Sequence, residues 1–213
     1  MSRLFAGIYD WFMRDTERAC LAAWRATLLG PLRGHVVEVG AGTGANLAHY
    51  PSDLASLTLC EPDAHMRAKL QHNIAQSASR ETSILDASVE SLPMQDASVD
   101  VIVCTLVLCS VSDPALALKS FARVLRPGGS LVYIEHVAAH NDPTRLRLQR
   151  RIDGVWSRVA EGCHVTRDTA ASIRQAGFEV VHEQRESMRK ALPWLRPTIR
   201  GVALWPLVTS SPS

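Results

Sequence analysis

The stretch from Val101 to Leu108 is apolar at every position except Thr105. A run without polar alternation suits a parallel strand that helices cover on both faces. Similar short runs, rich in Val, Ile and Leu, recur from residue 35 onward and alternate with longer segments of helical periodicity. Strands are predicted at 35–40, 57–61, 82–86, 99–105 and 130–136. This alternation predicts an α/β fold built on a parallel sheet.

Start and stop signals predict the two longest helices after the fourth strand. The first covers 114–125 and ends where Arg-Pro-Gly-Gly follows. Asp142 before Pro143 predicts the start of the second, as an N-cap followed by proline at the first helical position. The apolar stripe of that helix consists of Leu148, Ile152, Val155, Trp156 and Val159.

Weaker signals cover the two ends of the chain. Thr166 is expected to cap a further helix that ends near Gly177. Two final strands, at 178–182 and 199–205, could pair as a hairpin. The first 34 residues predict two helices, the second of which opens near Asp15.

Composition favours one soluble globular domain. The 213 residues show no repeat or linker, so we expect 1–34 to form helices that act as a lid or cap on a domain spanning 35–213. Twenty-three basic and 21 acidic residues give a net charge of +2, too small for a nucleic-acid surface. The five cysteines form no zinc-like spacing and no secretory signal or membrane span is present, so we expect no metal and a cytoplasmic location.

The first strand runs into a glycine-rich turn, Val-Val-Glu-Val-Gly-Ala-Gly-Thr-Gly, at residues 36–44. Glycines permit positive φ and let a ligand lie against backbone N–H groups where a helix begins. Gly40, Gly42 and Ala45 also satisfy the dinucleotide pattern, and Glu61 after the second strand suits a ribose in either kind of nucleotide site. The turn alone therefore leaves an NAD(P) oxidoreductase open.

Three further residues favour a different cofactor. Glu38 precedes the turn, Gly44 adds a third glycine, and Asp86 closes the third strand. This combination is similar to the S-adenosylmethionine sites of class I methyltransferases. The resemblance implies a doubly wound, seven-stranded, mostly parallel sheet in the order 3-2-1-4-5-7-6, with S-adenosylmethionine at the carboxyl ends of strands one to four.

The same resemblance implies a role for each matching residue. Glu38 would help to hold the methionine ammonium group, and Glu61 would bind both ribose hydroxyls. Pro62 and Met66 would pack beside the adenine, whose amino group Asp86 would bind. The expected cofactor site comprises Glu38, Gly40, Gly42, Gly44, Glu61, Pro62, Met66, Asp86, Ala87, Cys104 and Thr105.

Later segments narrow the resemblance. The segment 104–111 lacks the (Asn/Asp)-Pro-Pro-(Tyr/Phe) signature of amino-methylating DNA and RNA enzymes. Instead, the chain resembles the animal alkyl-thiol S-methyltransferases of the methyltransferase-like group and their bacterial relatives. The matching positions are 104–111, 135–137, Gly162, Cys163, Thr166, Arg167, Trp194, Pro197, Ile199 and Gly201.

The narrower resemblance implies methyl transfer to a small thiol. The alternatives are an N-, O- or C-methyltransferase acting on a phospholipid, quinone or secondary metabolite, and a regulator that binds the cofactor without turnover. The animal proteins carry a long apolar N-terminal anchor, whereas here only a short stripe is apolar: Leu4, Phe5, Ile8, Trp11 and Phe12. A lid over the site is therefore favoured over a peripheral membrane contact.

A thiol acceptor is mostly protonated at neutral pH, so a base would assist its attack on the methyl group. His136, after the fifth strand, is the first candidate and Glu135 the second, with Asp153 and His164 as further alternatives. Cys109 and Cys163 are better explained as small apolar side chains than as nucleophiles. The expected acceptor pocket comprises Tyr9, Trp11, Cys109, Trp156 and His164.

Overall fold

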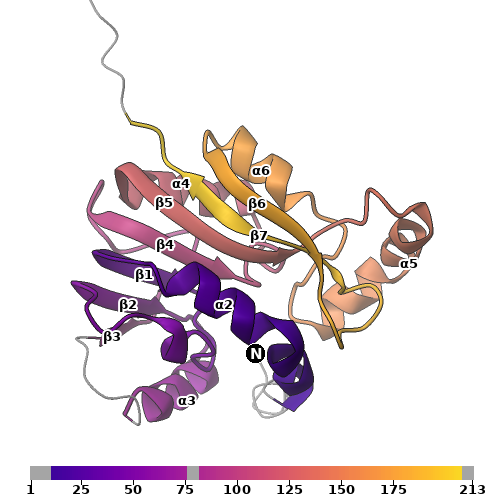
Figure 1. Ribbon diagram of the computed structural model, residues 1–213, viewed down its shortest axis with the longest axis horizontal. Coiled ribbons are helices and arrows are strands. Elements are labelled where there is room, and N and C mark those ends of the chain that lie inside the picture. Colours follow the sequence, from indigo (N-terminus) through magenta and orange to yellow (C-terminus); the bar gives the residue numbers. More distant parts are fainter. Residues whose placement is uncertain (1–10, 76–81, 208–213) are drawn as a thin grey trace, which may run out of the picture.

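A twisted seven-stranded sheet forms the centre of the computed structural model, which describes residues 11–75 and 82–207 (Figure 1). Its strand order is β3-β2-β1-β4-β5-β7-β6. The first five strands in that order pair in parallel, and β7 lies antiparallel between β5 and β6. The predicted fold class and strand order are therefore confirmed. The strands are β1 (His35–Val39), β2 (Ser56–Cys60), β3 (Thr82–Leu85), β4 (Val99–Thr105), β5 (Leu125–His136), β6 (Glu179–Ser187) and β7 (Pro197–Leu204).

Helices cover both faces of this sheet. They are η1 (Glu17–Leu21, a π-helical turn), α2 (Ala22–Leu29), η2 (Leu47–His49, a 3₁₀ turn), α3 (Ala64–Ala75), α4 (Pro114–Val124), α5 (Pro143–Val159) and α6 (Thr169–Gln175). Among the described residues, no helix combines the length and the apolar character that a membrane span requires.

The alternation of side chains along β4 explains why the sheet needs helices on both sides. Val101 belongs to one apolar cluster together with Trp24 of α2, which lies in front of the strands in Figure 1. Its neighbour Ile102 belongs to a second cluster together with Phe121 of α4. Because both faces of β4 are buried, its sequence contains no polar alternation.

The N-terminal helix differs from its prediction. Residues 11–16 are helical and continue through η1 into α2, so the predicted break near Asp15 is wrong. Asp15 caps nothing here, because its exposed carboxylate pairs with Arg14 at 3.7 Å and Thr16 has helical φ and ψ. The described part of this helix buries Leu21 and Trp24 in the core of the sheet.

Three other element boundaries differ from their predicted positions. Strand β5 begins at Leu125 rather than at 130, because Leu125 already pairs with Val99 of β4. Helix α6 is capped by Asp168 rather than Thr166, since the Asp168 carboxylate accepts from the backbone N–H of Ala171 at 3.1 Å. The final hairpin is longer than predicted, with β6 extending to Ser187.

Helix α5 begins where it was predicted, with the Asp142 carboxylate accepting from the N–H of Arg145. Its apolar stripe is not a core face, because Val155 and Val159 are 66% and 64% exposed. The side chain of Gln149 is buried instead and bonds to three backbone groups, at residues 137, 139 and 194. Hydrogen bonds of Gln149 thus anchor α5, which projects from one end of the sheet (Figure 1).

Two glycines provide a matched test of this packing. A Cβ at Gly201 would lie 2.2 Å from the carbonyl oxygen of His182 and 2.8 Å from the Tyr133 hydroxyl. We expect Gly201→Ala to lower the free energy of unfolding by roughly 1–3 kcal/mol, because backbone must move to accept the methyl group. In α5, a Cβ at Gly154 meets no atom of the described residues within 4 Å, so Gly154→Ala should stabilise by up to about 1 kcal/mol. Urea denaturation checks both, and equal effects would contradict the packing described.

Candidate active site

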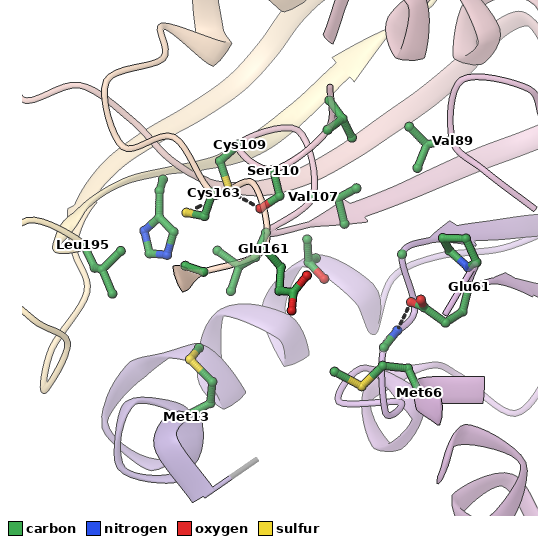
Figure 2. A pocket seen from close by; sticks show the side chains of 18 of the residues that line it. Met13, Glu61, Met66, Val89, Val107, Cys109, Ser110, Glu161, Cys163 and Leu195 are labelled. Carbon is green, nitrogen blue, oxygen red and sulfur yellow. Dashed lines mark hydrogen bonds between the residues drawn. The ribbon is translucent and has the colours of Figure 1, made fainter. Parts of the chain in front are cut away.

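A cavity of about 590 Å³ opens at the carboxyl ends of the parallel strands (Figure 2). Open α/β sheets bind their ligands at this edge. One half comes from the β1, β2 and β3 side and is lined by Gly40, Gly42, Glu61, Pro62, Met66 and 88–90. The other half comes from the N-terminal helix, the β4 and β5 ends and α5, and is lined by Phe12, Met13, 105–107, 109–111, His136, Trp156, 159–161, Cys163 and Leu195.

The glycine turn leaves open space beside the backbone. Gly40 and Gly42 have φ of 60° and 57°, and no atom of the described residues lies within 4 Å of a Cβ built at Gly42. A side chain at Gly40 would collide with Val107 at 2.5 Å. In the described residues between β1 and β2, the short η2 turn takes the place of the expected α-helix. Ligand contact here therefore depends on exposed backbone rather than on a helix N-terminus.

Glu61 lies at the cavity wall, directly after β2. Its carboxylate accepts from the backbone N–H of Gly42 at 2.8 Å and of Asp63 at 2.9 Å. Burial raises the pKa of this carboxyl, while the same two N–H groups and Arg67 oppose the shift. Each carboxylate oxygen holds one N–H and can accept a further hydrogen bond, as a ribose diol requires.

Glu38 lies behind the glycine turn rather than in the cavity lining. Its carboxylate accepts from Asn46 Nδ2 and from the Tyr50 hydroxyl, both at 2.8 Å. Arg25 of α2 donates to Asn46 Oδ1 at 2.6 Å and pairs with Glu17 at 2.9 Å. Burial raises the pKa of Glu38 to about 7, although these partners lower it. Glu38 thus joins the turn to the N-terminal helix.

Four other predicted cofactor residues also lie outside the cavity lining. Asp86 pairs with Arg67 at 2.7 Å and its side chain is 68% exposed. Gly44 faces Leu47 and Leu70, while Ala87 and Cys104 are buried in the sheet core. The cavity is lined instead by Ser88, Val89 and Glu90, which follow the same strand end. Their position after the third strand was the signal available in the sequence.

Glu135 is fully buried and was expected to be catalytic. Its carboxylate accepts from the backbone N–H groups of Val107, Leu108 and Cys109, at 3.0, 2.9 and 2.9 Å. Burial raises the pKa of this group, and the three N–H groups oppose that shift. Since its oxygens bind the loop and do not line the cavity, direct contact with an acceptor is not what the structure provides.

Two further features hold the same loop. Leu106 adopts φ of 60°, a left-handed conformation that is uncommon for a branched side chain. On the other side of the loop, the Arg167 guanidinium donates to the carbonyl oxygens of Leu108 and Val111 at 2.6 and 2.7 Å. The loop after β4 is therefore bound at both its N–H and its C=O groups.

His136 lines the cavity and is 6% exposed. Burial lowers the pKa of its imidazole to about 4, against a hydrogen bond to the backbone of Leu195 that raises it. Within the described residues, its Nδ1 is buried and has no hydrogen-bond partner. The ring is therefore neutral at pH 7, and no described residue pairs with one of its two nitrogens.

Two buried thiols stand beside it. The sulfurs of Cys109 and Cys163 are 3.9 Å apart, and both residues line the cavity with Trp156 (Figure 2). The hydrogen bond between them raises the pKa of Cys109 and lowers that of Cys163. Trp156 packs edge-to-face on Trp194, with ring centroids 5.7 Å apart.

Of the remaining predicted pocket residues, those that the structure describes do not line the cavity. Tyr9 falls outside the described residues. Trp11 is 66% exposed, and its neighbours Phe12 and Met13 line the cavity in its place. His164 pairs with Asp153 at 2.8 Å, outside the lining. Two lining residues, Glu161 and Leu195, were not predicted, because neither lies at a strand end or within a binding motif.

The buried position of Glu38 predicts a pH effect on stability. Its folded pKa, about 7, exceeds that of an unfolded carboxyl, so ionisation favours unfolding. The Glu38 contribution to stability is therefore lost as pH rises from about 4.5 to 7, by about 3 kcal/mol in total. Relative to Glu38→Gln, the wild-type protein should lose this stability over that window in urea titrations. Glu179→Gln, which changes an exposed carboxylate, should show the same dependence of stability on pH as the wild type. If the stability of Glu38→Gln instead changed with pH in parallel with that of the wild type, the cost of burying the Glu38 carboxylate would be contradicted.

Comparison with known proteins decides between the cofactors that the glycine turn allows. Residues 37–133 match a family model described as a methyltransferase domain. The chain is 36% identical over 173 residues to the thiol S-methyltransferase TMT1B of Rattus norvegicus and 35% identical over 173 residues to the thiol S-methyltransferase TMT1A of Homo sapiens. In both cases the match covers 79% of this chain and 70% of the relative.

Solved structures agree on the fold. The methyltransferase solved with the Trm112 activator of Haloferax volcanii superposes with a TM-score of 0.72 at 19% identity, covering 96% of this chain and 97% of that one. An NAD(P) oxidoreductase is therefore not supported, and S-adenosylmethionine is the cofactor. These relatives agree with the glycine turn and with the acids at the strand ends. The chain belongs to the S-adenosylmethionine-dependent methyltransferases, in the family of the thiol S-methyltransferases.

Proposed function

We propose that this enzyme transfers the methyl group of S-adenosylmethionine to the sulfur of a small, apolar thiol. The observation that carries the proposal is the second half of the cavity, which lies beside the predicted cofactor half and has walls of Val107, Val111, Trp156 and Leu195. Apolar walls favour a neutral, poorly hydrated acceptor. The relatives that are named thiol S-methyltransferases support the choice of sulfur.

The cofactor half fits the adenosine part of S-adenosylmethionine. In this proposal the open space at Gly42 lies against the ribose, and Glu61 accepts hydrogen bonds from its two hydroxyls. Pro62 and Met66 supply the apolar surface for the adenine. When bound, the cofactor supplies an electrophilic methyl group on a positively charged sulfur.

The chain contributes positioning and exclusion of water, which account for much of the acceleration in an in-line displacement. Glu135 acts here as a positioning residue, because it fixes the loop at 107–109, which supplies Val107 and Cys109 to the wall of the cavity. Glu38 acts indirectly, by holding the glycine turn through Asn46 and Tyr50.

His136 is the proposed acceptor of the thiol proton. The neutral ring lines the cavity, and Nδ1 has no partner within the part of the chain that the structure describes. When the thiol sulfur takes the methyl group and S-adenosylhomocysteine is left as the second product, the S–H proton would pass to the imidazole of His136 and then to solvent. Burial lowers the pKa of this imidazole to about 4, so the ring is unprotonated at neutral pH and has a lone pair with which to accept.

Five cysteines, all present as free buried thiols, support a reducing compartment such as the cytoplasm as the place of action. None is needed as a nucleophile in this proposal.

Methyl transfer tests the function directly. Purified protein is incubated with methyl-labelled S-adenosylmethionine and with an alkyl thiol, sulfide, a phospholipid amine or a quinol, and both labelled product and S-adenosylhomocysteine are measured. We expect label on thiols. Label only on the lipid or quinol would overturn the thiol assignment, while cofactor binding without any turnover would support a regulator.

Glu61→Ala should abolish saturable cofactor binding at concentrations that saturate the wild type, since it removes two charge-assisted hydrogen bonds.

The base assignment has its own test. We expect His136→Ala to lower kcat for an alkyl thiol at pH 7 by roughly 10²-fold or more, and to affect an aryl thiol that is already ionised less than tenfold. A merely structural role would lower both rates equally. His164→Ala is the matched control, because this histidine is bonded to Asp153 outside the cavity and should leave both rates unchanged.

A further inference from the structure

One carboxylate in the cavity has no part in the scheme above. Glu161, in the turn after α5, lines the cavity and belongs to the exposed residues. Figure 2 shows its side chain in the space between the Cys109 side of the cavity and Glu61. Among the described residues no cation or hydrogen-bond donor pairs with this carboxylate, so its charge is available to a ligand.

The backbone fixes the direction of this side chain. Glu161 has φ of 51°, in the left-handed region that non-glycine residues rarely adopt. The next residue, Gly162, has φ of 93°, and a Cβ there would lie 2.5 Å from the carbonyl oxygen of Ser110. Bonds from the N–H of Cys163 to the Ala160 carbonyl, and from the N–H of His164 to the Cys109 carbonyl, close the turn. Glu161 is thus presented to the cavity by a turn packed on the β4 loop.

The other charges in the cavity do not neutralise it. Glu61 and Glu90 also line the cavity, whereas no lysine or arginine among the described residues does. Glu61 holds two backbone N–H groups, and Glu90 accepts hydrogen bonds from the hydroxyls of Ser88 and Ser112. Both lie on the cofactor side or at its rim. Glu161 is therefore the carboxylate left to meet the acceptor.

We propose that Glu161 selects the acceptor by charge, admitting neutral and cationic thiols and disfavouring thiols that carry a carboxylate. The inference rests on the proposed thiol methylation and adds the residue that decides which thiols react. The physical reason is that a fixed charge in a concave, largely apolar site acts through a lower effective dielectric than water provides. An anionic acceptor meets repulsion there, and no lysine or arginine among the described lining residues offsets it.

The test uses three acceptors with the same carbon chain: 3-mercaptopropionate, 3-mercapto-1-propanol and 3-mercaptopropylamine. For each, kcat/KM is measured with the wild type and with Glu161→Gln, and the variant-to-wild-type ratios are compared, so that differences in intrinsic thiol reactivity cancel. We expect Glu161→Gln to raise the ratio for 3-mercaptopropionate about tenfold relative to the neutral thiol, and to lower that for the amine by a similar factor. Glu161→Lys should extend both changes, and high salt should reduce them.

Two controls keep the test decisive. Glu179→Gln removes an exposed carboxylate at the start of β6, away from the cavity, and should leave all ratios unchanged. Glu161→Gly suits the left-handed backbone and should reproduce the charge effect if the Gln variant folds poorly. If folded variants change kcat/KM equally for all three acceptors, or do not change it for any of them, this inference is overturned while the proposed function stands. Failure of the wild type to methylate even the neutral thiol would overturn the proposed function and, with it, this inference.

Discussion

The site depends on the hydrogen bonds that the buried carboxylate of Glu135 accepts from the loop after β4. This carboxylate lies near the end of β5, fully excluded from water, and accepts from three consecutive backbone N–H groups of the loop after β4. A buried charge is costly unless hydrogen bonds compensate for it, and here the compensation comes from the loop that must be positioned. The loop in turn supplies Val107, Cys109 and Ser110 to the cavity wall.

A second buried carboxylate, Glu38, does the same for the glycine turn. Through Asn46 and Arg25 it connects the turn to the N-terminal helix, so that Phe12 and Met13 of this helix close one side of the cavity. Both acids follow or end buried strands, where a charged residue would otherwise be unfavourable. Their burial makes the shape of the cavity a property of the hydrogen-bond network rather than of its lining residues alone.

The patterns that sequence analysis interprets well are local. Apolar runs identified the parallel strands, and Asp142 with Pro143 identified the start of α5, because burial on both faces and helix capping are properties of neighbouring residues. Errors arose where a distant partner decides. Val155 and Val159 belong to the predicted apolar stripe, yet no described element covers them, since α5 projects from the sheet and Gln149 anchors it.

The glycine turn, the acids that end the strands and the order of the strands were determined by the sequence itself, because each depends on backbone sterics or on burial within a short segment. The role of each acid was decided only by the tertiary structure. Glu135 and Glu161 are both carboxylates near the same sheet edge. One is buried against three N–H groups, and the other has no partner among the residues that the structure describes. Residues far apart in the chain surround the first and leave the second exposed in the cavity.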